Sequence, residues 1–423
     1  MWKRNNPVLR FDNMATLAKG RIPGQLIIQY TDRCNAKCPQ CGMRVTEKFE
    51  RSKMKADDIK RIIDAAAASG VKSLSFTGGE TCLYYDELIS LISYAGDAGI
   101  EYIRTGTNGF MFMNSDKPDF TKRIATIAEA MAKTKLRNFW ISIDSADPSI
   151  HEEMRGLPGV ISGIRAALPI FHEHGIYPSA NLGINRNIGG KMEIIAELAE
   201  KDPERYYETF KKAFSDFYAF VEELGFTIAN ACYPMSIDKQ EDGELSAVYG
   251  ATSTDKIVSF SAAEKILMFK ALSDTIPLYR PKMRIFTPRV SLFVLIKQYQ
   301  NNRAFNYPCH GGIDFFFISA KDSNTYPCGY RGNESLGKFW DLKWKKIDQK
   351  PFCQECDWEC FRDPSVLIGN VLDLIRRPAY FARKAIMDQE YFKLWLEDLK
   401  YYRACDYYDG RKAPDYRKLK SYL

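Results

Sequence analysis

The feature that most constrains the fold of this 423-residue chain is a regular alternation of short apolar runs and amphipathic stretches over residues 24–234. The apolar runs are rich in β-forming residues, and the stretches between them carry apolar residues at helical spacing. Units of about 30 residues predict parallel strands joined by helical crossovers. The predicted strands are 24–30, 71–80, 100–109, 138–144, 177–185 and 226–234, and the predicted helices are 56–70, 85–99, 120–135, 160–175 and 204–224.

Six strands of this kind fit an open doubly wound sheet or an incomplete (β/α) barrel. Either architecture places the reacting groups at the carboxyl ends of the strands, so motifs that follow different strands meet at one mouth. From about 235 to 300 the alternation stops. We predict irregular structure there, with the charged stretch 238–244 as a solvated loop.

Cysteine usage indicates metal sites. The basic lead-in 1–23 lacks the apolar run of a secretory signal, and no stretch reaches the roughly 18 uninterrupted apolar residues of a membrane helix. We therefore expect a cytoplasmic protein, in which eleven cysteines are more typical of metal ligands or buried thiols than of disulfides. Three cysteines lie within 34–41 and five within 309–360, which predicts two metal sites.

The first group, Cys34, Cys38 and Cys41, follows the first predicted strand at C-x3-C-x2-C spacing. Three thiolates suit zinc or an iron–sulfur cluster. A structural zinc ion would need a fourth ligand from elsewhere in the chain. A [4Fe–4S] cluster held by three cysteines instead leaves one iron open to a small molecule. The spacing favours iron–sulfur and leaves zinc as the alternative.

Polar residues end two further predicted strands at the same mouth. The stretch "FTGGE" (76–80) offers consecutive backbone N–H groups and the Glu80 carboxylate, which suit an α-amino group lying along a strand edge. Ser142 and Asp144 can hydrogen-bond ribose hydroxyls. Arg155, eleven residues further on, can pair bidentately with a carboxylate.

In this order and combination, residues 24–235 resemble the radical S-adenosylmethionine (radical SAM) superfamily. The resemblance implies an α/β fold with an incomplete (β/α)6 barrel, and a [4Fe–4S] cluster whose open iron takes the amino and carboxylate groups of S-adenosylmethionine. It implies the cluster ligands Cys34, Cys38 and Cys41. The cofactor-binding residues that it implies are Gly78, Gly79, Glu80, Ser142, Asp144 and Arg155, with Glu80 near the amino group and Arg155 near the carboxylate.

The implied reaction is reductive cleavage of S-adenosylmethionine to a 5′-deoxyadenosyl radical, which abstracts hydrogen from an unidentified substrate. A one-electron donor such as flavodoxin or ferredoxin would be needed. Two positions depart from the family: Gln40 replaces an aromatic residue near the adenine, and Thr81 replaces a proline. Asn108, Asn181 and Asn230, at further strand ends, are candidate substrate contacts or ordinary loop caps.

The second cysteine group lies in a segment rich in Gly, Pro and aromatic residues. Its members are Cys309, Cys328, Cys353, Cys356 and Cys360. This segment resembles the SPASM or Twitch module of radical SAM enzymes, and the resemblance implies an auxiliary [4Fe–4S] cluster on the first four cysteines. Such a cluster can accept an electron from a substrate radical or ligate the substrate. Cys360 can replace one ligand, or join Cys405 in a second cluster, and a zinc knuckle is the alternative.

The remaining cysteines and histidines have plainer interpretations. Cys82 and Cys232 are predicted to be buried thiols, because free cysteine packs as a small hydrophobe. His310, beside Cys309, is the histidine that we consider nearest to a cluster.

The predicted domains are a lead-in (1–23), the partial barrel (24–300), the auxiliary module (301–365) and a helical tail (366–423). Residues 376–423 hold 12 Lys and Arg against 7 Asp and Glu, which favours anionic partners. Nucleic acid is not among the partners that we expect. One helical face of the tail carries Tyr391, Trp395, Leu399 and Tyr402. We expect this face to pack on the barrel, with peripheral membrane contact or an anionic substrate as the alternatives.

These observations predict a radical SAM oxidoreductase, or a maturase that acts on a peptide or a cofactor. The short lead-in before the first strand weighs against a dedicated peptide-binding domain. A zinc-binding structural or regulatory protein is the rival from another class, because both cysteine groups could serve structure alone.

Overall fold

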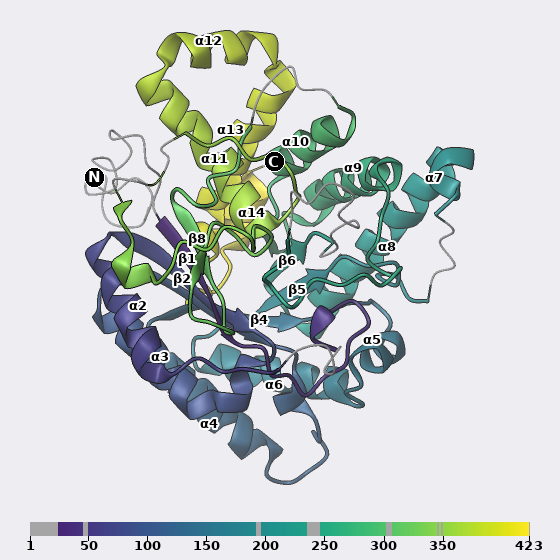
Figure 1. Cartoon of the computed structure of the whole chain (residues 1–423). Coiled ribbons are helices and arrows are strands. Elements are labelled where there is room, and N and C mark those ends of the chain that lie inside the picture. Colours follow the sequence, from purple (N-terminus) through teal and green to yellow (C-terminus); the bar gives the residue numbers. More distant parts are fainter. Residues whose placement is uncertain are drawn as a thin grey trace.

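The chain forms one mixed α/β sheet with helices on both faces (Figure 1). The computed structural model describes residues 24–422 apart from 45–49, 192–195, 235–245, 302–306, 345–346 and 348–349. The predicted lead-in 1–23 and the charged stretch 238–244 lie outside the described residues.

The strands follow the predicted alternation in the first half of the chain. They are β1 (Gly24–Thr31), β2 (Val71–Gly78), β3 (Tyr102–Thr107), β4 (Leu136–Ser142), β5 (Ser179–Gly183), β6 (Ile228–Cys232), β7 (Arg284–Ile285), β8 (Phe315–Ile318) and β9 (Thr325–Tyr326). Their order in the sheet is β7-β6-β5-β4-β3-β2-β1-β8-β9, and every neighbouring pair is parallel except β8 with β9. The sheet is a partial barrel that stays open between β7 and β9, as predicted.

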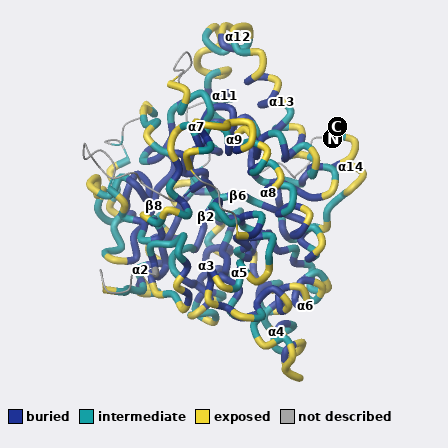
Figure 2. The backbone as a smooth tube through the Cα atoms, turned by 90° about the vertical axis from the view of Figure 1, so that its right-hand side faces the viewer, coloured by how far each residue is buried: buried dark blue, intermediate teal, exposed yellow. Residues whose placement is uncertain are grey.

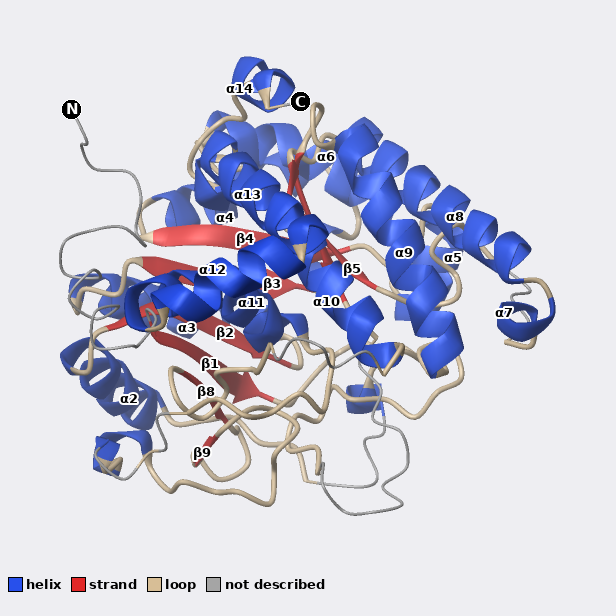
Figure 3. Cartoon of the chain, turned by 90° about the horizontal axis from the view of Figure 1, so that it is seen from above, coloured by secondary structure: helices blue, strands red, loops and turns tan. Residues whose placement is uncertain are grey.

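The helices form two sets. They are α2 (Ala56–Ala68), α3 (Tyr85–Asp97), α4 (Phe120–Ala132), α5 (Pro148–Arg155), α6 (Val160–Glu173), α7 (Leu198–Lys201), α8 (Pro203–Leu224), α9 (Ala262–Tyr279), α10 (Arg289–Tyr299), α11 (Glu359–Arg376), α12 (Pro378–Met387), α13 (Gln389–Ala404) and α14 (Tyr416–Ser421). Helices α2, α3, α4 and α6 cover the outer face of the sheet, and α11 to α13 lie over the other side (Figures 1 and 3).

The two faces of the sheet differ in polarity because successive strand residues point to opposite sides. The outward residues are apolar and fully buried against the helices; they include Leu26, Ile28, Leu74, Phe76, Ile103, Phe139 and Ile141. The inward residues are mostly polar; they include Gln25, Ser75, Arg104, Asn138, Ser179 and Asn181. A barrel interior of this composition favours a cavity over an apolar core.

Our prediction of irregular structure from 235 to 300 is wrong for α9 and α10. Helix α9 starts at a capping box in which Ser261 Oγ accepts from Glu264 N and Glu264 Oε2 accepts from Ser261 N. Both α8 and α10 pack against α9, so its buried residues lie on several sides. Apolar residues therefore do not recur along one face of α9. This 18-residue helix lacks the amphipathic pattern that predicts a helix from sequence.

The segment that we predicted as an auxiliary module contributes to the barrel sheet. Strand β8 pairs in parallel with β1, with Gln25 opposite Phe315 and Ile28 opposite Ile318. The turn that carries Cys309 precedes β8, and Cys328 follows β9. The second cysteine group is thereby fixed beside the first strand.

The C-terminal tail packs on the molecule, as predicted. Helix α13 lies against α10, and Tyr391 and Trp395 are buried in an apolar cluster with Val290 and Phe293. Helix α12 lies at the periphery, where Ile386 is exposed (Figure 2). Within the described part of the chain, no helix is both long and apolar enough to cross a membrane.

Candidate active site

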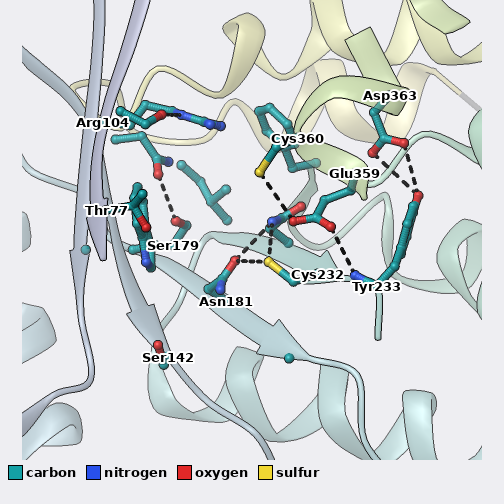
Figure 4. Close-up of a pocket in the computed structure, with 18 of the residues that line it drawn as sticks. Thr77, Arg104, Ser142, Ser179, Asn181, Cys232, Tyr233, Glu359, Cys360 and Asp363 are labelled. Atoms are coloured by element: carbon teal, nitrogen blue, oxygen red, sulfur yellow. Dashed lines mark hydrogen bonds between the residues drawn. The ribbon is translucent and has the colours of Figure 1, made fainter. Parts of the chain in front are cut away.

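The inner face of the sheet borders a cavity of about 2260 Å³, here called the inner cavity. Strand ends line one side of it, and residues of α11 and α13 line the other (Figure 4). The inner cavity is lined by the three predicted cluster ligands and by all six predicted cofactor-binding residues: Cys34, Cys38, Cys41, Gly78, Gly79, Glu80, Ser142, Asp144 and Arg155. Residues up to 121 positions apart in the chain therefore meet at one mouth, as expected for a parallel sheet.

The loop after β1 that carries Cys34, Cys38 and Cys41 is here called the cysteine loop. Hydrogen bonds to residues 251 and 253 hold it in place. Gly42 N donates to Ala251 O at 3.0 Å, and Ser253 Oγ donates to Pro39 O at 3.0 Å. A Cβ on Gly42 would lie 2.0 Å from the carbonyl oxygen of Thr252, so only glycine fits at this approach. Nothing in the sequence pattern indicated this contact, because it joins segments about 210 residues apart.

Burial raises the pKa values of the three thiols. It raises the pKa of Cys38 to about 12 and that of Cys41 to about 11, and it also raises the pKa of Cys34. The positive charge of Arg155 opposes this effect at all three sulfurs. Free thiols here are protonated at neutral pH, so a metal must displace their protons to bind.

The Gly-Gly-Glu edge differs from our prediction. We expected consecutive free N–H groups, but Gly79 N donates to Thr31 O at 2.7 Å and Glu80 N donates to Arg33 O at 2.8 Å. The cysteine loop takes both donors because it lies directly against this edge, where a Cβ on Gly79 would meet Arg33 O at 2.1 Å. An amino group at this edge would instead meet acceptors, namely carbonyl oxygens and the Glu80 carboxylate.

Glu80 is fully buried and held in place by backbone donors. Its Oε2 accepts from Asn108 N at 2.6 Å, and its Oε1 accepts from Cys82 N at 3.0 Å. Burial raises the pKa of Glu80, and these two hydrogen bonds oppose the rise. Asn108 Oδ1 accepts from Phe110 N, and Asn108 Nδ2 donates to Asn35 Oδ1 at 2.8 Å. Asn108 therefore serves as a loop cap, one of the two roles that we predicted for it.

Asp144 is the centre of a polar group at the end of β4. Its Oδ2 lies 2.7 Å from Arg155 Nε and accepts from Gln40 Nε2 at 2.6 Å. The backbone N–H of Asp144 donates to Nδ1 of His151, which is fully buried and whose pKa burial lowers to about 4. Gln40, which departs from the family pattern, thus orients the predicted ribose-binding carboxylate.

Helix α5 positions Arg155. Asp147 caps its first turn, with Pro148 at the first helical position, and Gly156 ends it in a left-handed conformation with φ of 66°. Arg155 is the last residue of this helix and lies beneath the cysteine loop, where it is largely buried. In this structure its charge is balanced by Asp144.

Trp140 is a cavity residue that the sequence analysis missed. It lies opposite Gly106 in the β3–β4 register, and a Cβ on Gly106 would fall 2.1 Å from the indole nitrogen. The indole therefore lies over the glycine on the inner face. The available signal was an aromatic residue at an inward position of a predicted strand, next to a glycine in the neighbouring strand.

The second cysteine group forms a small enclosed space, here called the auxiliary pocket. The pocket is lined by Cys309, Cys328, Cys353 and Cys356, which are the four ligands that we predicted, together with Gly311, Arg331, Trp358 and Phe361. Backbone pairing brings two of these cysteines together, because Cys309 N donates to Cys353 O at 2.8 Å. Four thiols from three separate segments of the chain therefore surround one space, because Cys353 and Cys356 share a loop.

Backbone donors reach two of these sulfurs. Gly311 N donates to Cys309 Sγ and Tyr330 N donates to Cys328 Sγ, both at 3.4 Å. Burial raises the pKa of Cys328 to about 12, whereas the Tyr330 hydrogen bond lowers it. Hydrogen bonds to sulfur favour the thiolate form, which is the form that binds metal.

Three alternatives for this region lack support. Cys360 lines the inner cavity instead of the auxiliary pocket, and its Sγ donates to Glu359 Oε1 at 3.4 Å. Cys405 is buried and lines neither space, so it shares no site with Cys360. His310 pairs with Asp314 at 3.1 Å and does not line the auxiliary pocket. The reason is helix α11, which begins at Glu359 and turns Cys360 away from the preceding cysteines.

The two predicted buried thiols differ in environment. Cys82 is 4% exposed, and its Sγ contacts Gly106 O at 3.9 Å, as predicted for a packed thiol. Cys232 is only partly buried and faces the inner cavity, where its Sγ donates to Asn181 Oδ1 at 3.3 Å (Figure 4).

Trp358 separates the two cysteine sites. It lines both the inner cavity and the auxiliary pocket, and its ring centroid lies 6.1 Å from that of Tyr249 and 4.8 Å from that of Phe361. Tyr249 OH in turn lies 3.0 Å from Thr77 Oγ1 on β2. Trp358 and the rings beside it therefore form a wall that the two spaces share.

The mouth of this partial parallel barrel gathers a three-cysteine loop, a Gly-Gly-Glu edge and an Asp–Arg pair. Residues 28–200 match the radical SAM superfamily, which identifies this part of the chain as a radical SAM domain. The match spans 173 of the 423 residues, so it assigns this part of the chain alone.

Curated relatives agree with this assignment. The chain is 22% identical over 315 residues to an AdoMet-dependent heme synthase of Methanosarcina barkeri, a match that covers 74% of this chain and 79% of the relative. It is 30% identical over 154 residues to a GTP 3',8-cyclase of Vibrio parahaemolyticus, which covers 35% of this chain and 42% of that enzyme. The shared part of the cyclase is thus less than half of its length.

A solved structure shares the fold over almost the whole chain. The structure, described as a polyhistidine-tagged anSMEcpe with bound AdoMet, aligns with a TM-score of 0.50 and 14% identity, over 95% of this chain and 98% of that one. At this identity the similarity shows the fold alone.

Proposed function

We propose that this protein is a radical SAM oxidoreductase or maturase that uses S-adenosylmethionine and carries an auxiliary [4Fe–4S] cluster. The observation that carries the proposal is the convergence of Cys34, Cys38 and Cys41 with the predicted cofactor residues on the wall of one cavity. Three thiols with open space beside them suit a cluster that has one free iron. When bound and reduced, that cluster supplies the electron that splits S-adenosylmethionine into methionine and a 5′-deoxyadenosyl radical.

The chain supplies binding and orientation for the cofactor. Carbonyl oxygens of the Gly78–Gly79 edge and the Glu80 carboxylate accept hydrogen bonds from the amino group. Ser142 and Asp144 contact the ribose, while Gln40 and Arg155 hold Asp144 in position. Arg155 also has donors left for the cofactor carboxylate, because a guanidinium carries five N–H groups.

The auxiliary pocket fits a second cluster on Cys309, Cys328, Cys353 and Cys356. In the described residues no group of three or more His, Cys, Asp or Glu side chains is arranged to hold one metal ion. Four thiolates can hold a [4Fe–4S] cluster or a zinc ion, and the metal and sulfide analysis described below distinguishes the two. Such a cluster would supply an electron acceptor behind the Trp358 wall.

The name of one relative, an AdoMet-dependent heme synthase, links AdoMet to the synthesis of a cofactor, and a structure of similar fold holds bound AdoMet. A cofactor precursor or a peptide are the substrate classes that we propose. We also propose a one-electron donor such as flavodoxin or ferredoxin, a cytoplasmic location, and peripheral membrane contact through the C-terminal tail as the tail's alternative role.

The test uses anaerobically purified full-length protein. We expect about eight iron and eight acid-labile sulfide per chain, an electron paramagnetic resonance signal that changes when S-adenosylmethionine is added, and 5′-deoxyadenosine after reduction with dithionite. The rival function, a zinc-binding structural protein, predicts a colourless preparation with zinc and without sulfide. An unchanged signal on cofactor addition would contradict the proposed function.

A further inference from the structure

Arg104 is a cationic side chain on the inner face of β3 that the proposed cofactor site does not use. Its neighbours in register are Ser75 on β2 and Asn138 on β4, so the guanidinium rises from an uncharged polar floor. Arg104 Nε donates to Ser75 Oγ at 2.8 Å. Figure 4 shows Arg104 on the strand side of the inner cavity, across from Cys360 and Glu359 on α11.

Within the described residues, no ion pair joins Arg104 to a carboxylate; the buried Arg284 and Arg362 also lack one, but each donates to at least two neutral acceptors. Arg155 pairs with Asp144, Arg186 with Glu264, and Arg280 with Asp398. A partly buried cation without a counter-ion is costly unless water or a ligand solvates it. The inner cavity leaves room for either beside Arg104.

The five carboxylates that line the inner cavity are engaged elsewhere, and one of them, Asp406, pairs with Lys412 at 3.6 Å and Lys418 at 3.9 Å. Glu80 accepts two backbone N–H groups and Asp144 pairs with Arg155. Glu359 accepts from Tyr233 N and Cys360 Sγ, and Asp363 accepts from Tyr233 OH. Burial raises the pKa of both Glu359 and Asp363, which favours their neutral forms and reduces the repulsion of an anion.

Two further cations line the same cavity from helix α13. Lys400 and Arg403 are exposed, and neither has an ion-pair partner among the described residues. Positive charge around a cavity raises the local concentration of anions and speeds their entry. The inner cavity thus carries positive charge on its floor and at the tail helix.

We propose that the Arg104 guanidinium binds an oxyanion of the substrate, a carboxylate or a phosphate, through a bidentate pair of hydrogen bonds. The planar fork of arginine matches both groups, which a lysine ammonium does not. This inference rests on the proposed function, and it adds the chemical class of the substrate: an anionic molecule anchored on β3, with its remaining part between Trp140 and α11. The anchor lies on a different strand from the cofactor residues on β2 and β4.

The test measures the binding of three small probes to the anaerobically reconstituted full chain saturated with S-adenosylmethionine. The probes are benzoate, phenyl phosphate and the neutral isostere benzamide, and isothermal titration calorimetry gives the dissociation constants. We expect at least one anionic probe to bind about tenfold or more tightly than benzamide. The stronger of the two anions assigns the site to a carboxylate or to a phosphate.

Variants of Arg104 then test whether the anion binds at this side chain. R104Q should weaken anion binding about tenfold or more, and R104K should give an intermediate value because it keeps the charge without the fork. R165Q makes the same charge change on the exposed outer surface of α6 and should leave the affinity unchanged. Circular dichroism and iron content check that each variant is folded.

Two results would overturn the anion site: benzamide binding as tightly as both anions to the wild-type chain, or folded R104Q binding anions as tightly as the wild type. Formation of 5′-deoxyadenosine by the same wild-type preparation tests the proposed function separately. If it is absent while the Arg104-dependent anion binding remains, the proposed function fails and the anion site stands.

Discussion

The two cysteine sites differ in the number of thiols and in what surrounds them. Cys34, Cys38 and Cys41 lie on the wall of a cavity of about 2260 Å³, so space for another molecule adjoins their sulfurs. The four auxiliary thiols instead enclose a small pocket that Trp358 and Phe361 close. The number of thiols and the access to them therefore agree: three thiols adjoin a large cavity, whereas four surround a pocket with little free space.

The largest expected effect is on the site of Cys34, Cys38 and Cys41, here called the open site. Replacing Cys38 with alanine removes one of three cluster ligands, so we expect 5′-deoxyadenosine formation to fall by roughly a thousandfold or more. The product is measured by chromatography after anaerobic reduction. The control is C82A, since the Cys82 thiol is buried against β3 and lines neither cysteine site. Equal loss of iron in C38A and C82A would contradict the assignment.

The auxiliary pocket should lose its iron independently of the open site. In C328A we expect about four fewer iron atoms per chain, because the auxiliary pocket then holds three of its four thiols. The spectroscopic change caused by S-adenosylmethionine should persist, since it arises at the open site. Iron analysis and electron paramagnetic resonance measure the two quantities. A chain that keeps all its iron would show that the pocket holds no cluster.

Gly79→Ala tests how closely the open site depends on the strand edge. The new Cβ would lie 2.1 Å from the carbonyl oxygen of Arg33, a backbone atom that cannot move without shifting the cysteine loop. We expect cofactor cleavage to fall about 10- to 100-fold, since small misplacements of reacting groups have effects of this size. Gly369→Ala on α11 is the matched control, because its Cβ would meet nothing within 4 Å. Equal activities of the two variants would contradict the close approach.

The smallest expected effect concerns His151, whose Nδ1 accepts a hydrogen bond from the backbone N–H of Asp144. The folded pKa of His151, about 4, lies below its ordinary value of 6.5, so the folded chain stays neutral there while the unfolded chain gains a proton. The free energy of unfolding therefore falls as the pH drops from 6.5 towards 4, by up to about 3 kcal/mol from this residue. Urea unfolding of the cluster-free protein at several pH values measures the slope.

The variant H151Q should lose this part of the pH dependence, whereas H172Q, which changes a half-buried histidine on α6, should keep it. The same slope in wild type and H151Q would show that His151 does not stay neutral in the folded chain.

Much of the site could be predicted because its residues follow strands, and short runs of the sequence are enough to predict those strands. Apolar β-forming runs predicted β1 to β6, and the parallel arrangement then required the motifs after β1, β2 and β4 to meet. The four thiols of the auxiliary pocket were predicted from a family resemblance, and the structure brings these four together. In both cases the information lies within short segments.

Other features could not be predicted because they depend on contacts between distant segments. Helix α9 was missed since its neighbours α8 and α10 bury several of its sides. The N–H groups of Gly79 and Glu80 are taken by carbonyl oxygens of the cysteine loop, which a motif alone does not reveal. Cys360 lies in the same short run as Cys353 and Cys356, yet the start of α11 directs it into the inner cavity.

The sequence by itself determined the order of strands and helices, the cysteine spacing and the polar strand ends, because hydrophobic periodicity and ligand spacing are local properties of the chain. Only the tertiary structure decided which groups share a space: Arg104 with α11, Gln40 with Asp144, and Trp358 with both cysteine sites. The physical reason is that such neighbourhoods arise from the pairing of strands in the sheet and the docking of the C-terminal helices. Both bring together residues far apart in the chain, whose pairing no local pattern encodes.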